Sequence, residues 1–225
     1  MSKLRYQLTQ NGISPRWIPG SFDESGNPNP ICFANGDEHD ELGSVDESSQ
    51  NAILMADKRK LKEEEIKKYL PQPEVFGPEI ASLSFVGFGS TKNVIIDVIN
   101  FVKNYKLTSK STEKIENTKT DLLIQKLNFK NNIWADLENL INDNPNFEIN
   151  YLSYSYICPL QTEKLTEFMA KNTNICLIEG NGTGQLGKLI KMETGLDFSQ
   201  KLLKYDGRQF FVEDILEFIC SQNKV

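Results

Sequence analysis

Two glycine-rich segments near the C-terminus contain the residues of this chain best suited to bind a ligand or a partner. Residues 177–187 read LIEGNGTGQLG, where an apolar run ends in a turn with glycines at 180, 182 and 184, and a helix is predicted from about Gln185. Residues 204–210 read KYDGRQF, a second glycine turn ahead of a last predicted helix. Backbone N–H groups at the start of a helix can hold an anion, and glycine also lets another backbone approach closely.

The spacing of the first turn differs from that of a dinucleotide-binding loop. It is G-x-G-x-G-x-x-G rather than G-x-G-x-x-G, and the turn follows the third predicted strand instead of the first. A third turn, GFGSTK at residues 87–92, matches neither that motif nor the P-loop. Lys92 and free N–H groups could hold an anion there, but a tight strand-to-helix turn explains the segment without a ligand.

His39 lies among carboxylates in the segment GDEHDE, residues 36–41. A metal site is one interpretation, but consecutive side chains rarely converge on one ion, so an acidic surface turn is favoured. His39 is the single histidine of the chain, and no candidate nucleophile has the turn context of a Ser–His or Cys–His catalytic set.

The four cysteines are widely spaced and form no CxxC pair; they are Cys32, Cys158, Cys176 and Cys220. We therefore expect no metal or iron–sulfur site built from this chain alone. Cys176 and Cys220 fall on apolar faces, where a buried reduced thiol is the expected state.

Composition excludes several classes of protein. The 225 residues suffice for one large domain or two small ones, and 39% of them are hydrophobic. The net charge of −6 argues against a nucleic-acid surface. No run approaches the ~20 apolar residues that span a bilayer, and the polar start, residues 1–10, lacks the apolar core of a secretory signal. We expect a cytoplasmic protein that binds neither nucleic acid nor membrane.

The second half of the chain alternates predicted strands with predicted helices. Residues 84–88, 149–154 and 175–178 are expected as adjacent central strands, with a weaker strand near 202–205. The predicted helices cover residues 91–105, 161–172, 185–193 and 212–221. This alternation predicts an α/β fold with a mainly parallel sheet and helices on both faces.

Three other segments depart from this alternation. Residues 1–45 are rich in turn residues, yet carry apolar side chains that need a surface to cover them, and one helix is predicted at 46–69, capped by Asp46 or Ser48. The prolines of PQPEVFGPE end that helix, and a domain boundary is predicted at about residue 78. Residues 107–146 form an insertion, expected to be partly mobile and partly helical, the helical spacing being that of Trp134, Leu137, Leu140 and Ile141. The apolar side chains of the first segment are Trp17, Ile18, Phe22, Ile31 and Phe33.

Six motifs follow one another along the chain, in the order ISPRWIPG, GDEHDELG, MADKRKLK, GFGSTK, LIEGNGTGQL and KYDGRQF. Together they resemble the alpha subunit of 2-oxoacid:ferredoxin oxidoreductases, where SPR-IPG, GDEHDE-G, a DKR helix, WGSTK, EGN-TGQL and KYDGR-F follow one another in this order. The resemblance covers most of the chain outside the insertion.

The resemblance implies a division of the chain. Residues 1–78 would be the tail of a pyrimidine-type thiamine diphosphate domain plus a linker, and residues 79–225 a transketolase C-terminal-like α/β domain. The complete enzyme would oxidatively decarboxylate a 2-oxoacid, 2-oxoglutarate being expected, to the acyl-CoA, with ferredoxin as the electron acceptor. Thiamine diphosphate, magnesium and an iron–sulfur cluster are implied for the complete complex.

The same resemblance implies that this chain alone binds none of those cofactors. The family's YPITP-like cofactor segment and its segment that binds the substrate carboxylate would lie upstream of this chain. A separate beta subunit would hold the diphosphate and magnesium. We therefore expect no catalytic residue here. Partners would be the beta subunit and the remaining part of the alpha subunit, with ferredoxin and CoA reached through the complex.

The motif residues of the two C-terminal turns are expected to act in packing or subunit contact. They are Gly180, Asn181, Gly182, Thr183, Gly184, Gln185, Lys204, Tyr205, Asp206, Gly207 and Arg208. We expect Gly182 to need a positive φ. The alternative is a free-standing α/β binding domain that has kept the fold and lost the enzyme activity.

Overall fold

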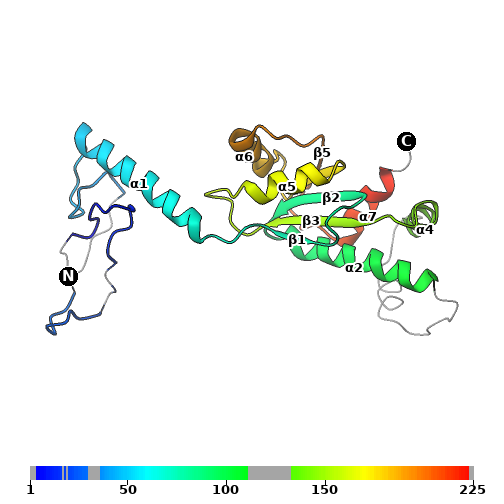
Figure 1. The fold of residues 1–225 in the computed structure, drawn as a ribbon, viewed down its shortest axis with the longest axis horizontal. Helices are drawn as coiled ribbons and strands as arrows, with labels where there is room; N and C mark the ends of the chain where they lie inside the picture. The colour runs from blue at the N-terminus through cyan, green and yellow to red at the C-terminus, as the bar shows by residue number, and fades with distance from the viewer. Residues whose placement is uncertain (1–3, 17, 19, 30–35, 111–132, 223–225) are drawn as a thin grey trace. The chain divides into compact units, whose positions relative to one another are not determined.

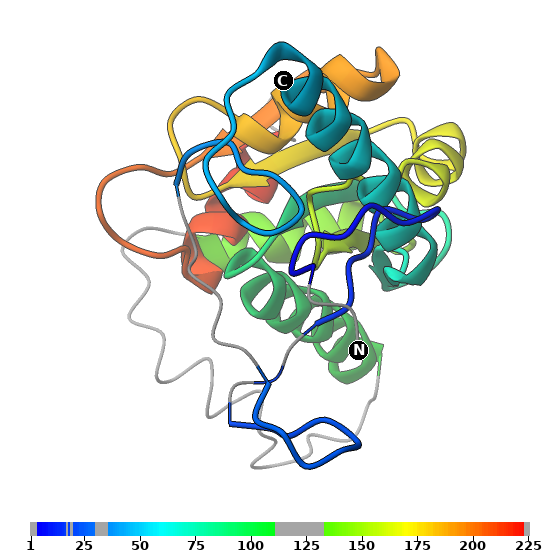
Figure 2. The same ribbon diagram turned by 90° about the vertical axis from the view of Figure 1, so that its left-hand side faces the viewer.

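The computed structural model describes residues 4–16, 18, 20–29, 36–110 and 133–222 (Figures 1 and 2). It separates into one unit that ends at Leu70 and a second that begins at Pro71. The boundary expected at about residue 78 lies earlier because strand β1, Glu74–Phe76, pairs with a strand of the second unit. This strand was not predicted. It is short and flanked by prolines, which suits the edge position that it takes.

Within the described residues, the sheet of the second unit has five strands in the order β1-β3-β2-β4-β5. The parallel strands are β2 (Leu83–Phe88), β3 (Ile149–Tyr154), β4 (Ile175–Glu179) and β5 (Gln200–Leu203). Strand β2 pairs with both β3 and β4, so the three predicted central strands are confirmed as neighbours. Strand β5 starts two residues earlier than predicted, and β1 is the antiparallel edge.

Helices cover both faces of this sheet (Figure 1). One face packs against α2 (Thr91–Lys110), α4 (Ile133–Asp143) and α7 (Val212–Ser221), and the other against α5 (Glu163–Lys171) and α6 (Gln185–Thr194). Figure 2 shows α2 in green and α6 in orange on opposite sides of the strands. Neighbouring strand residues alternate between the two cores: Phe85 faces the first and Val86 the second. The predicted α/β fold is confirmed.

The predicted insertion contributes to the core. Helix α2 continues to Lys110, beyond the predicted end at 105, and α4 buries Leu137, Leu140 and Ile141 in the first core. The side chain of Trp134 and residues 111–132 lie outside the described part of the chain. The helical part of the insertion is therefore a structural layer of the domain.

The first unit is built on α1, Ser49–Tyr69, and the Ser48 side chain caps it by accepting a hydrogen bond from Asn51 N at 3.3 Å. The capping prediction is thereby confirmed for Ser48. Tyr6 N donates to Glu41 O at 2.9 Å, which ties the start of the chain to the acidic turn. Ile18 and Phe22 remain exposed, while Trp17, Ile31 and Phe33 lie outside the described residues.

The irregular segment lies close against the backbone of α1 at Gly12. Its φ is +71°, and a Cβ there would overlap the carbonyl oxygen of Lys58 and lie 2.5 Å from Lys62 N. We expect Gly12→Ala to release residues 6–14 from α1, because helix backbone cannot yield as a flexible side chain can. Faster hydrogen exchange and proteolysis of this segment would report the release.

Gly26 provides the matched control for this substitution. Its φ is +79°, but an added Cβ would meet no atom within 4 Å. Gly26→Ala therefore introduces backbone strain of about 1 kcal/mol without a clash. Equal protection of residues 6–14 in the two variants would disprove the packing role of Gly12.

Candidate functional site

Three glycine turns meet at one edge of the sheet. The segments GFGSTK, EGNGTGQ and KYDGR follow the carboxyl ends of β2, β4 and β5, which are neighbours in the sheet. Lys204 N donates to Glu179 O at 3.1 Å, which joins the second and third turns directly. Open α/β sheets bind ligands at this edge, so the motifs occupy the position where a site is expected.

The carboxylate of Glu179 fills the start of α6. It is fully buried at the end of β4, and it accepts hydrogen bonds from Leu186 N and Gly187 N at 3.1 Å each and from Asn181 Nδ2 at 2.7 Å. These two backbone donors belong to the first turn of α6, where an anionic ligand would otherwise bind. The protein thus supplies its own hydrogen-bond acceptor at this helix start.

Asn181 holds the rest of the same turn. Its Oδ1 accepts from the backbone N–H groups of Thr183, Gly184 and Gln185 at 3.1, 2.8 and 3.3 Å. Gly184 has a φ of +62° and precedes α6. These three donors of the glycine turn are therefore satisfied by a side chain of the motif itself, which favours packing over ligand binding.

Gly182 is required for a different reason from the one predicted. Its φ does not lie in the left-handed region, so that expectation is wrong; a Cβ there would lie 3.1 Å from two carbons of the Tyr205 ring. Gly182 and Tyr205, which are 23 positions apart in the sequence, thus pack the two motifs on each other through a glycine and an aromatic ring. In the second turn, Gly207 does have a positive φ, +83°.

The KYDGR turn directs some side chains inward and others outward. Lys204 Nζ lies 2.5 Å from Asp214 Oδ2 and packs over the rings of Phe210 and Phe211, at 5.8 and 5.2 Å from their centroids. Tyr205 is 75% exposed.

The other charged pair of this turn joins two residues of the turn itself. Arg208 lies 2.5 Å from Asp206, and hydrogen bonding by Arg208 lowers the pKa of Asp206. Tyr205 and Arg208 are thus both exposed on this turn, with Arg208 held by Asp206.

Lys92 of GFGSTK is engaged within the protein. It forms an ion pair with Glu74 and lies 4.8 Å from the centroid of the Phe76 ring, both in β1. Thr91 Oγ1 donates to Phe88 O at 2.9 Å, which closes the turn locally. Of the two interpretations of this segment, the contacts favour the strand-to-helix turn over an anion site.

The acidic turn around His39 is also held by internal contacts. The His39 and Tyr6 ring centroids are 3.8 Å apart, and Asp40 Oδ1 accepts from three N–H groups of the following turn. Glu38 and Arg59 approach to 2.5 Å, and hydrogen bonding to Arg59 lowers the pKa of Glu38 to about 2. Two of the six motifs, GDEHDE and MADKRK, are thus joined by an ion pair.

The titratable groups form no metal cluster in the part of the chain that the structure describes, where no three His, Cys, Asp or Glu side chains are suitably grouped. Cys176 and Cys220 are buried free thiols as expected, and burial raises the pKa of Cys176 to about 12. None of the described helices combines the length and apolarity needed to span a bilayer.

Sequence reasoning missed the buried role of Glu179 and the contact between Gly182 and Tyr205. A glutamate that ends an apolar strand and precedes a helix start by a few residues is the available signal for the first. The ring contact has no such local signal, because it joins residues from two separate turns.

Curated relatives match nearly the whole chain. The alpha subunit of 2-oxoacid:ferredoxin oxidoreductase 1 from Sulfurisphaera tokodaii is 23% identical over 224 residues, covering 98% of this chain and 28% of that protein. The alpha subunit from Saccharolobus solfataricus is 24% identical over 218 residues, covering 96% and 27%. The chain therefore spans little more than a quarter of the length of these relatives. No family model matches it.

A solved structure supports the fold. The 2-oxoglutarate:ferredoxin oxidoreductase from Magnetococcus marinus, determined with 2-oxoglutarate, coenzyme A and succinyl-CoA bound, aligns with a TM-score of 0.61 and 22% identity. The alignment covers 97% of this chain and 30% of that one. The fold and the curated relatives thus agree with the order of the six motifs: the chain is homologous to part of the alpha subunits of 2-oxoacid:ferredoxin oxidoreductases.

Proposed function

We propose that this chain is the C-terminal portion of the alpha subunit of a 2-oxoacid:ferredoxin oxidoreductase, with a structural and subunit-contact role. Its first unit would complete a pyrimidine-type thiamine diphosphate domain, and its second would be the transketolase C-terminal-like domain. The complete enzyme would convert a 2-oxoacid to its acyl-CoA and reduce ferredoxin. The name of the Magnetococcus marinus protein supports 2-oxoglutarate as the substrate.

The observation that carries this role is the internal use of the motif side chains. Glu179 and Asn181 cap α6, Lys92 pairs with Glu74, and Lys204 pairs with Asp214. Such contacts shape turns and fix helices, and they leave these groups committed within the fold. We therefore assign no catalytic or cofactor-binding step to them. Thiamine diphosphate, magnesium and an iron–sulfur cluster would be bound elsewhere in the complex.

Two surfaces, one in each unit, would receive the partners. Helix α1 exposes several large apolar side chains, and such a surface is suited to burial against the remaining part of the alpha subunit; the residues are Ile53, Leu54, Leu61 and Tyr69. In the second unit, Tyr205, Arg208 and Phe211 form an exposed aromatic and cationic surface beside the glycine turns. Tyr and Arg are typical anchors of protein interfaces, so we assign this second surface to the beta subunit.

The alternative is a free-standing α/β binding domain. The second unit favours it, because both apolar cores of the sheet are formed by residues of that unit alone. Activity measurements separate the alternatives. The chain alone is expected to give no reduction of a ferredoxin-type acceptor from 2-oxoglutarate and CoA. Co-expression with the beta subunit and the remaining alpha segment from the same source should give a complex that does.

Gly182→Val tests the assigned surface. Valine would displace the Tyr205 ring, and we expect at least tenfold weaker association with the beta subunit, measured by size exclusion and titration. Gly180→Ala is the control, because an added Cβ at Gly180 would meet no atom within 4 Å. Equal association of the two variants with the beta subunit would show that Tyr205 is not part of the interface.

The activity measurement is judged separately. Turnover of 2-oxoglutarate by the isolated chain would contradict the proposed structural role.

A further inference from the structure

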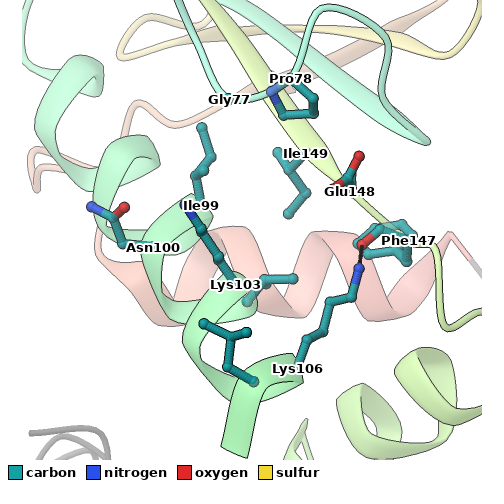
Figure 3. Close-up of a pocket in the computed structure, with 11 residues that line it drawn as sticks. Gly77, Pro78, Ile99, Asn100, Lys103, Lys106, Phe147, Glu148 and Ile149 are labelled. Carbon is teal, nitrogen blue, oxygen red and sulfur yellow. Dashed lines mark hydrogen bonds between the residues drawn. The ribbon is translucent and has the colours of Figure 1, made fainter. Parts of the chain in front are cut away.

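A pocket of about 640 Å³ opens at the amino-terminal edge of the sheet, away from the glycine turns (Figure 3). It lies in the second unit, between α2, the turn that precedes β3, and the connection from β1 to β2. Its volume falls within the range of small-molecule sites. None of the family motifs contributes to its lining, so the proposed function does not explain it.

Most of the wall is apolar. Val102, Phe147 and Ile149 are almost fully buried, and they give the pocket a fixed base. Ile99 adds a partly buried side chain, and Leu107, also in the lining, is 62% exposed. Because Leu107 borders the hollow, a ligand with an apolar body would remove this side chain from water.

Two lysines give the pocket its charge. Lys103 and Lys106 are three residues apart on α2, so both side chains leave the helix on the side of the pocket. Figure 3 shows Lys106 extending toward Phe147 and Lys103 extending toward Ile99. Lys106 Nζ donates to Phe147 O at 3.2 Å, which holds its ammonium group against the wall. Among the described lining residues, Glu148 is the one acidic residue beside these two lysines.

We propose that this pocket binds an amphipathic organic anion. The apolar body would lie against Ile99, Val102 and Phe147, and the anionic group would meet the ammonium groups of Lys103 and Lys106. The lysine ammonium group is a compact point charge and lacks the planar, bidentate geometry of the arginine guanidinium. It can therefore pair with either a carboxylate or a phosphate. This inference does not rest on the proposed function, because it uses no motif residue and no partner surface.

Methyl NMR of the whole chain with four probes locates the site, the amphipathic probes being used below the concentrations at which they form micelles. Decanoate and decyl phosphate carry the two head groups on the same tail, 1-decanol lacks the charge, and inorganic phosphate lacks the tail. We expect the two amphipathic anions to shift the methyl signals of Ile99, Leu107 and Ile149, while Ile190, in the core of the opposite sheet face, stays unchanged. Comparison of the two anions identifies the preferred head group.

Charge-removing substitutions test the role of the lysines. Lys103→Met and Lys106→Met should each weaken binding of the two anions up to about fivefold, the effect of one partly exposed charge pair, and leave 1-decanol binding unchanged. Lys106→Arg should retain affinity. Lys188→Met removes an exposed lysine from α6, outside the pocket lining, and is the matched control.

Three outcomes would overturn the proposal. One is a set of shifts spread over both faces of the sheet. Another is binding of inorganic phosphate or 1-decanol as tight as that of decyl phosphate. The third is equal anion affinity of the lysine variants and the Lys188→Met control. Unchanged methyl spectra of the unliganded variants will show that each retains its fold.

Discussion

Replacing Ile178 with aspartate is expected to unfold the second unit. Ile178 is fully buried in the central strand β4 and belongs to the core shared with α2, α4 and α7. The substitution removes about 1.5–3 kcal/mol of apolar burial and places a carboxyl group where water is absent, which costs several kcal/mol more. Domains of this kind are stable by only about 5–15 kcal/mol. We expect loss of the cooperative thermal transition and of hydrogen-exchange protection in β2, β3 and β4.

Ile80→Asp provides the control for this prediction. Ile80 belongs to the same unit but is 64% exposed, so the same chemical change should shift the melting temperature by no more than a few degrees. A melting curve of Ile178→Asp that matches those of wild type and Ile80→Asp would show that β4 is not a buried strand.

Replacing Glu179 with alanine is expected to be the second most damaging change. The buried N–H groups of Leu186 and Gly187 would lose their acceptor, and each buried donor without a partner costs about 1–3 kcal/mol. Asn181 would lose the contact that orients its side chain. We expect a loss of about 2–6 kcal/mol in the free energy of unfolding, with early hydrogen exchange in the turn at 180–184 and in the first turn of α6.

Two further variants make this measurement specific. Glu179→Gln keeps one acceptor oxygen and should be intermediate in its effect. Glu193→Ala removes an exposed glutamate from the same helix and should change the free energy of unfolding little. If denaturant titration gives equal stabilities for Glu179→Ala and Glu193→Ala, the buried carboxylate has no capping role.

Local patterns along the chain were sufficient to predict most of the second unit. Continuous apolar runs predicted the three central strands, because strands buried on both faces need apolar side chains at every position. Helical spacing predicted the helices on both faces, and the serine before α1 predicted its cap. The six ordered motifs were sufficient to predict the family, which the curated relatives support over 98% of the chain.

Features that depend on long-range packing were decided only by the tertiary structure. Strand β1 is too short for a local pattern and forms because β3 offers it an edge. The spacing of Leu137, Leu140 and Ile141 predicted a helix within the insertion, but only the folded domain shows that α4 packs into the core.

The roles of the motif residues show the same division most clearly. The residue types at 180–184 and 204–208 were enough to predict turns there, because glycine, asparagine and aspartate favour turn conformations. They could not determine that Gly182 makes room for the Tyr205 ring, or that Glu179 occupies the start of α6. These contacts arise only when the carboxyl ends of β4 and β5 are brought side by side, and that pairing is a property of the folded sheet.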